Sequence, residues 1–162
     1  MLVAARPGRA VPAGSSVADE AYRLCRAAES ETGRIRTSLL ERGYERARAA
    51  VEADPRDARA QFAVFCTLGH RIADGGIGLA SPFDIYRALR ALDAAVELAP
   101  EDPDLATAKG ALLVSLPRLF GGDAAAGESW LRRALERDPG HSTARWYLAD
   151  LLARRGESAE AE

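Results

Sequence analysis

The sequence predicts an all-α protein, a right-handed stack of three to four helix pairs, on three observations. Alanine is abundant and β-branched residues are few, which favours helices. Three helix-like segments end alike, at Pro55, Pro100 and Pro139. Small or large apolar residues stand five, eight and twelve positions before each proline, and these offsets share one helical face. They are Ala50, Ala47 and Gly43, then Ala95, Leu92 and Ala88, then Ala134, Leu131 and Gly127.

The N-terminal stretch, residues 1–16, is rich in Pro, Gly and Ser and predicts a disordered leader before a helical domain at 17–162. Arg6 and Arg9 interrupt the apolar core of about 7–15 residues that a signal peptide needs. No apolar run approaches the ~18 residues of a membrane span. We therefore expect a cytoplasmic protein without a membrane segment, or a periplasmic one if the gene starts further upstream.

The helices follow in order, each with its start or stop signal. Ser81 is the expected N-cap of the fourth helix, with Pro82 at its first position. Pro117 should kink or end the fifth helix, and Asp123 should cap the sixth after a glycine turn. The expected helices are 17–30, 34–53, 57–72, 82–98, 103–119 with the kink at Pro117, 124–137 and 143–155.

The glycines of "FGGDAAAGESW" have the spacing of a phosphate-binding loop, but the residues after them do not fit one. Such a loop needs Lys and then Ser or Thr after the second glycine. Here Glu128 and Ser129 follow Gly127, and a carboxylate would repel a triphosphate. We therefore assign Gly122 to an interhelix turn and Gly127 to close helix packing, with no bound nucleotide.

The register resembles the tetratricopeptide repeat, a helix–turn–helix unit of about 34 residues with a closing proline. The segment "GGDAAAGESWLRRALERDP" matches best, and "ARWYLADLLARRGESAEAE" matches the opening of a following unit. The resemblance implies an α-solenoid of about three to four such pairs. Pro55 and Pro100 are 45 residues apart and Pro100 and Pro139 are 39 apart, so the second and third units carry insertions.

The resemblance also implies a concave groove that binds a protein or peptide partner, without catalysis. Phe62 and Trp146 are the candidate anchors, because aromatics dominate interface hot spots. Phe62 could equally lie in the core, and only one of Trp146 and Tyr147 can face the groove. Asn is absent and Lys109 is the only lysine, so a Lys/Asn clamp for a peptide carboxylate is not expected. The predicted groove residues are Arg59, Phe62, Cys66, His70, Asp104, Thr107, Ala111, Ser115, Thr143, Trp146, Asp150 and Arg154.

A narrower resemblance concerns "LPRLFGGD" and the extended helix before it. It is similar to part of the T-component family of TRAP-type transporters, periplasmic repeat lipoproteins thought to pair with a solute-binding protein. That family's lipid-acceptor cysteine has no counterpart near the start of this chain. The alternative function is therefore a T-component-like accessory protein of a solute transporter.

Enzyme, metal and nucleic-acid functions find little support. The net charge is −2 with both signs interspersed, so no basic footprint indicates nucleic acid. Cys25 and Cys66 are expected to be two small buried or half-buried thiols, and His70 and His141 to be isolated, so we expect neither metal nor cofactor. The enzyme alternative is a thiol–imidazole pair formed by Cys66 and His70, one helical turn apart.

The C-terminal helix suggests a docking surface. Leu148 and Leu152 are expected to pack on the preceding pair, while Leu151 and Tyr147 would stay partly exposed. Exposed apolar patches mark interaction surfaces. We therefore expect this end to dock onto a second copy or a partner.

Overall fold

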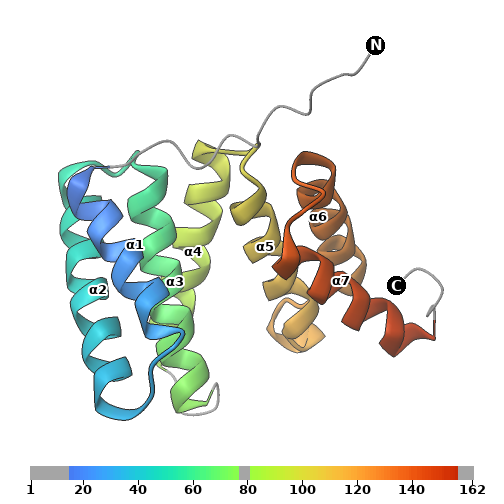
Figure 1. Ribbon diagram of the computed structural model, residues 1–162, viewed down its shortest axis with the longest axis horizontal. Helices are drawn as coiled ribbons and strands as arrows, with labels where there is room; N and C mark the ends of the chain where they lie inside the picture. Colours follow the sequence, from blue (N-terminus) through green and yellow to red (C-terminus); the bar gives the residue numbers. More distant parts are fainter. Residues whose placement is uncertain (1–14, 77–80, 157–162) are drawn as a thin grey trace. The chain divides into compact units, whose positions relative to one another are not determined.

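The computed structural model describes residues 15–76 and 81–156, and these residues form helices and no strand (Figure 1). The all-α prediction is confirmed. The helices are α1 (Ser16–Ala28), α2 (Gly33–Ala53), α3 (Ala58–Gly75), α4 (Pro82–Leu98), α5 (Pro103–Ser115), the 3₁₀ turn η1 (Arg118–Phe120), α6 (Ala124–Arg137) and α7 (Ser142–Arg155). The expected leader falls almost wholly outside the described residues, and residues 77–80 after α3 also lie outside them.

Polar residues fix where the helices begin. Side chains of Ser15, Asp57, Asp102 and Asp123 accept hydrogen bonds from backbone N–H groups in the first turns of α1, α3, α5 and α6. Ser81 is the N-cap of α4 and Pro82 its first residue, as predicted, although the Ser81 side chain makes no capping hydrogen bond. Its backbone carbonyl accepts from the N–H groups of the first turn instead.

Helix α5 ends at Ser115, four residues earlier than expected, because of Pro117. A residue before proline is pushed out of the helical region, and Leu116 has φ −78° and ψ 141°. The chain then makes η1 and turns at Gly121, whose φ is 87°. Gly122 leaves no room for a side chain, since an added Cβ would lie 1.8 Å from the carbonyl oxygen of Leu116. The glycine pair is thus the interhelix turn that the sequence predicts.

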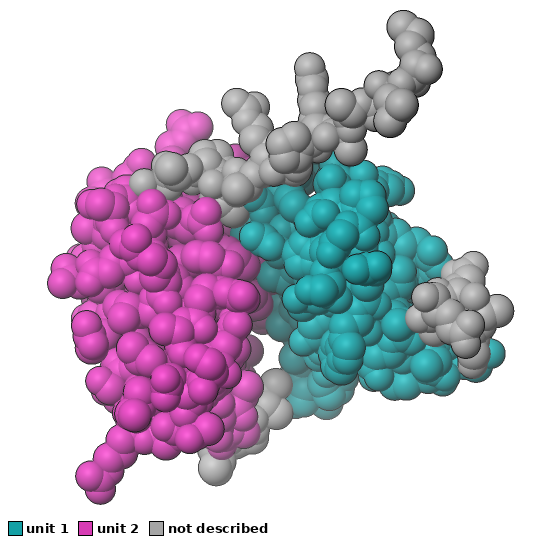
Figure 2. Space-filling view, in the orientation of Figure 1, with its two compact units in different colours: residues 1–10, 100–162 teal, residues 11–99 magenta. Residues whose placement is uncertain are grey.

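The described helices divide into two compact units, α1–α4 within residues 11–99 and α5–α7 within residues 100–162 (Figure 2). Each unit has its own buried cluster. Tyr44, Val64 and Leu68 lie in the first core, which draws on α1 to α4. Leu131, Leu148 and Leu152 lie in the second, which draws on α5 to α7. The described residues form two compact units, and the single helical domain at 17–162 stays a prediction.

Within each unit, helices that follow one another in the chain pack together. In the first unit α1 packs on α2 and α3, α2 on α3, and α3 on α4; in the second, α5, α6 and α7 all pack on one another. All nine positions of the proline register are buried, including Ala95 and Ala134 at 0% exposure. The register therefore marks the inward face of α2, α4 and α6, as predicted.

Glycines allow the closest helix approach. A Cβ on Gly110 of α5 would lie 2.9 Å from the carbonyl oxygen of Gly127 on α6, and a Cβ on Gly127 would lie 3.0 Å from that of Gly110. The two backbones thus meet at this pair, and Gly127 is the small packing residue that the sequence predicts. Among the described helices, none has both the length and the apolar character that crossing a bilayer requires.

Candidate functional site

Cys25 of α1 and Cys66 of α3 are joined by a disulfide, with their Cα atoms 6.3 Å apart. The expectation of two free thiols is therefore wrong. Cys25 is completely buried, whereas Cys66 is half-buried. The pairing depends on α1 lying against α3, and the 41-residue separation in sequence gives no signal of it.

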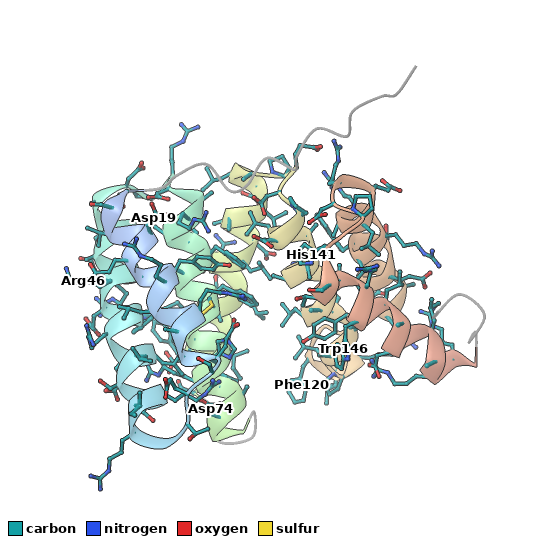
Figure 3. The ribbon with its side chains drawn as sticks, viewed as in Figure 1. Asp19, Arg46, Asp74, Phe120, His141 and Trp146 are labelled. Atoms are coloured by element: carbon teal, nitrogen blue, oxygen red, sulfur yellow. A yellow bond between two sulfur atoms is a disulfide. The ribbon has the colours of Figure 1, made fainter. Side chains whose placement is uncertain are left out.

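His70 and Arg36 extend this cluster. His70 follows Cys66 by one helical turn, and its Nε2 lies 3.7 Å from Oε1 of Glu29. Arg36, on α2, donates to Nδ1 of His70 at 3.1 Å, to Oδ2 of Asp74 at 2.6 Å and to the carbonyl oxygen of Ala28 at 2.5 Å. This guanidinium thus joins the end of α1 to the last turns of α3. Figure 3 labels Asp74 on that end of α3.

The hydrogen bond from Arg36 to Asp74 raises the pKa of Arg36 above its ordinary value, with burial acting in the opposite direction. Arg36 therefore stays charged and holds a hydrogen bond on Nδ1 of His70. The predicted thiol–imidazole pair does not exist in this state, because Cys66 has no thiolate while the disulfide stands. Sequence reasoning missed Arg36 and Glu29, which come from other helices.

The other predicted groove residues of the first unit lie against α1. Phe62 is only 7% exposed, and its ring stands 5.5 Å from Tyr22 and 6.2 Å from Phe65. It is therefore a core residue and not an exposed anchor. Arg59 lies 4.7 Å from the centre of the Tyr22 ring and 3.5 Å from Asp19, so its side chain is engaged within the unit.

In the second unit, His141 connects α5 to α7. Its Nε2 lies 2.9 Å from Oδ1 of Asp104 and 3.5 Å from Oγ1 of Thr107, while its Nδ1 accepts from the N–H of Ala144. This arrangement corresponds to the tautomer with hydrogen on Nε2. Thr107 is buried at 4% exposure and does not line a groove, which corrects the prediction, while Ala111 is half-buried. Sequence reasoning took His141 as isolated.

Helix α7 presents the predicted anchor Trp146, at 63% exposure (Figure 3). Tyr147 is half-buried against the core, with its ring edge-on to Trp146 at 4.9 Å. A shallow hollow is lined by these two residues with Ser142 and Thr143. As predicted, one aromatic faces the core and the other faces outward.

Further along α7 the prediction is corrected at one position. Leu148 and Leu152 are buried as expected, but Leu151 is also buried, at 5% exposure. The exposed face of α7 therefore does not include Leu151. Asp150 and Arg154 form an ion pair on the same helix at 2.6 Å.

Other large apolar side chains are exposed at places that sequence reasoning did not single out. Leu119 and Phe120 of η1 are 88% and 58% exposed, and Phe83 and Tyr86 of α4 are 62% and 61% exposed. The signal for the first pair was available, since "RLF" directly follows the helix-ending Pro117 and has no helical face to bury.

Comparison with known proteins assigns no family. No family model matches this chain, and no curated protein matches it either. The function is therefore argued from the geometry.

Proposed function

We propose that the chain is a non-catalytic, tetratricopeptide-like scaffold module that binds a protein or peptide partner through the exposed surface of its odd-numbered helices. The helix pairing within each unit and the nine buried register positions support this proposal. In such repeats the first helix of each pair lines a concave groove. The proposal includes a right-handed α-solenoid as the arrangement of the pairs.

The observation that carries the proposal is Trp146. The indole of Trp146 is 63% exposed beside a shallow hollow, and burying its apolar surface against a partner would be favourable. Trp is also the residue type most enriched at interface hot spots. Thr143 and Ser142 offer hydroxyls for a peptide backbone beside it. With a net charge of −2 and interspersed signs, the partner is a peptide with an apolar side chain and not a nucleic acid.

Selection from a displayed random-peptide library tests this proposal. Enriched peptides should bind the parent chain, and Trp146→Ala should weaken binding by at least about 2 kcal/mol, roughly 30-fold in Kd. Arg145→Ala, an exposed neighbour on the same helix, is the matched control and should bind normally. A selection that enriches no peptide, or peptides that bind Trp146→Ala as tightly as the parent, would reject this surface.

Self-association through α7 cannot use Leu151, which is buried; it would involve Tyr147, which is half-buried, and the exposed Trp146. If two copies dock there, sedimentation velocity should show a concentration-dependent dimer that Trp146→Ala abolishes. If the protein stays monomeric at high concentration, the dimer is rejected and the partner-binding proposal is unaffected.

The second candidate is the T-component-like accessory protein, and the disulfide favours it. Disulfides persist in oxidising compartments such as the periplasm and are rare in the cytosol. Cell fractionation with thiol alkylation tests the location. A periplasmic protein with both cysteines protected from alkylation supports this candidate, and a cytoplasmic protein with both cysteines alkylated opposes it.

A further inference from the structure

The disulfide and His70 form a compact set of metal-binding side chains. Cys25, Cys66 and His70 each offer one ligand atom, and the three atoms lie within 4.8 Å of one another. A tetrahedral Zn²⁺ site has Zn–S distances of about 2.3 Å and Zn–N distances of about 2.0–2.1 Å, which separates its ligand atoms by roughly 3.5–3.8 Å. The set has the size of such a site once the bond between the sulfurs is open.

We propose that the reduced protein binds one Zn²⁺ at Cys25, Cys66 and His70. Helix α1 is then cross-linked to α3 by a disulfide in the oxidised protein and by a metal ion in the reduced protein. This inference does not depend on the partner-binding function, since that proposal is carried by Trp146 of α7 in the other unit.

The disulfide is converted to the metal site in two steps, reduction and then metal binding. A dithiol reductant gives two electrons and two protons to the S–S bond and becomes a disulfide itself, leaving two cysteine thiols. Zn²⁺ then binds both sulfurs as thiolates, with release of two protons, and accepts the lone pair of one nitrogen of the neutral His70 ring. The other ring nitrogen carries the hydrogen, so Arg36 gives up its hydrogen bond to Nδ1 of His70 and keeps its bonds to Asp74 and to the carbonyl oxygen of Ala28. A water molecule or the Glu29 carboxylate, which lies 3.7 Å from Nε2 of His70, completes four ligands.

The surroundings suit a cation in the reduced state. Arg36 is the nearest positive charge to His70, at 3.1 Å, but Asp74 neutralises it at 2.6 Å. Two thiolates and Glu29 then leave an excess of negative charge beside the ring. The buried side chain of Cys25 closes the site at α1, while the half-buried Cys66 and His70 give the ion a route in.

Titration of the reduced protein tests the proposal. The full chain is reduced with a phosphine and freed of metal, and Co²⁺ is added. We expect one Co²⁺ per chain, with the intense visible bands of tetrahedral coordination and a thiolate-to-metal band, and displacement by one Zn²⁺. The oxidised protein should show neither band.

Single variants identify the ligands. Cys25→Ser, Cys66→Ser and His70→Ala should each weaken Zn²⁺ binding by at least about tenfold. His141→Ala removes the other histidine and should bind as the parent does. Binding that survives His70→Ala, or that the oxidised chain shows equally, would overturn the proposal.

Circular dichroism covers the case in which reduction unfolds the chain. Recovery of helical signal on addition of Zn²⁺ supports the site. A reduced chain that binds no Co²⁺, whether folded or unfolded, contradicts it.

Discussion

In the unit formed by α1–α4, side chains cross-link helices, whereas in the unit formed by α5–α7 the backbones themselves come together. The Cys25–Cys66 disulfide and the Arg36 guanidinium join α1, α2 and α3. In the second unit, Gly110 and Gly127 bring α5 and α6 so close that neither position has space for a methyl group. The first unit thus has a covalent link between helices, whereas the second combines charged links, such as His141 with Asp104, with a close approach of two helix backbones.

We expect the largest loss of stability from removing the Cys25–Cys66 disulfide of the first unit. A disulfide that spans 41 residues removes roughly 4 kcal/mol of chain entropy from the unfolded state. Cys66→Ala, measured in EDTA, should therefore lose about 4 kcal/mol by urea denaturation followed by circular dichroism. Treating this variant with a reductant is the control and should change nothing further. A variant as stable as the oxidised parent would contradict the role given to the disulfide.

We expect the next largest loss of stability from adding a side chain at Gly127, where α5 and α6 approach most closely in the second unit. In Gly127→Ala the new Cβ would lie 2.5 Å from a methyl carbon of Val114 and 3.0 Å from the carbonyl oxygen of Gly110. Overpacking of this kind costs about 1–3 kcal/mol. Chemical denaturation should report that loss in the free energy of unfolding, and an unchanged midpoint would show that α5 and α6 are not in backbone contact.

Gly69→Ala in the first unit can be compared with Gly127→Ala in the second, because the substitution is the same and the surroundings differ. Gly69 lies inside α3, and a Cβ there would meet nothing within 4 Å. Because alanine is a better helix former than glycine, Gly69→Ala should stabilise the protein by about 0.5–1 kcal/mol. Thermal denaturation checks the sign, and a loss of stability would mean that the surface at Gly69 is covered.

The smallest effect concerns Glu128 of α6, which forms ion pairs with Arg132 of the same helix and with Arg155 of α7. Hydrogen bonds from Arg132, and then from Arg155, hold the pKa of Glu128 below its ordinary value of 4.5. A lowered folded pKa contributes stability that is present above about pH 4.5 and is lost as the pH falls through the folded pKa. Glu128→Gln should therefore cost at most about 1 kcal/mol near pH 7.

The pH dependence provides the check for this prediction. The difference between parent and Glu128→Gln should disappear well below the ordinary pKa, and Glu136→Gln, an exposed glutamate on the same helix, should have no effect at either pH. If the stability difference between the parent and Glu128→Gln persists in acid, it arises from lost packing at this position and not from the lost charge of Glu128.

Sequence patterns predicted the helix boundaries and the buried helix faces well, because these features depend on residues that are close together in the sequence. The proline register located the buried faces of α2, α4 and α6, and Pro117 and Asp123 located the break before α6. These signals depend on helical periodicity and capping, which act over a few residues.

Contacts between distant residues could not be predicted in the same way. The disulfide, the contact of Arg36 with His70 and the contact of His141 with Asp104 each join helices through tertiary packing. Phe62 also shows the limit, because a rotation of one residue about the helix axis decides between core and groove. The spacing of Cys66 and His70 was the one local sign of the cluster of Cys25, Cys66 and His70. It gave no indication that Cys25 of α1 belongs to the same cluster.

The most direct test of the comparison uses the two tryptophans as a reporter. Trp130 and Trp146 both lie in the second unit, so their fluorescence follows that unit, whereas circular dichroism follows both. We would denature the oxidised and the reduced protein in EDTA and record both signals. The account predicts that reduction lowers the midpoint of part of the dichroism transition and leaves the fluorescence midpoint unchanged. A fluorescence midpoint that falls together with the dichroism would show that the disulfide stabilises both units and would contradict the account.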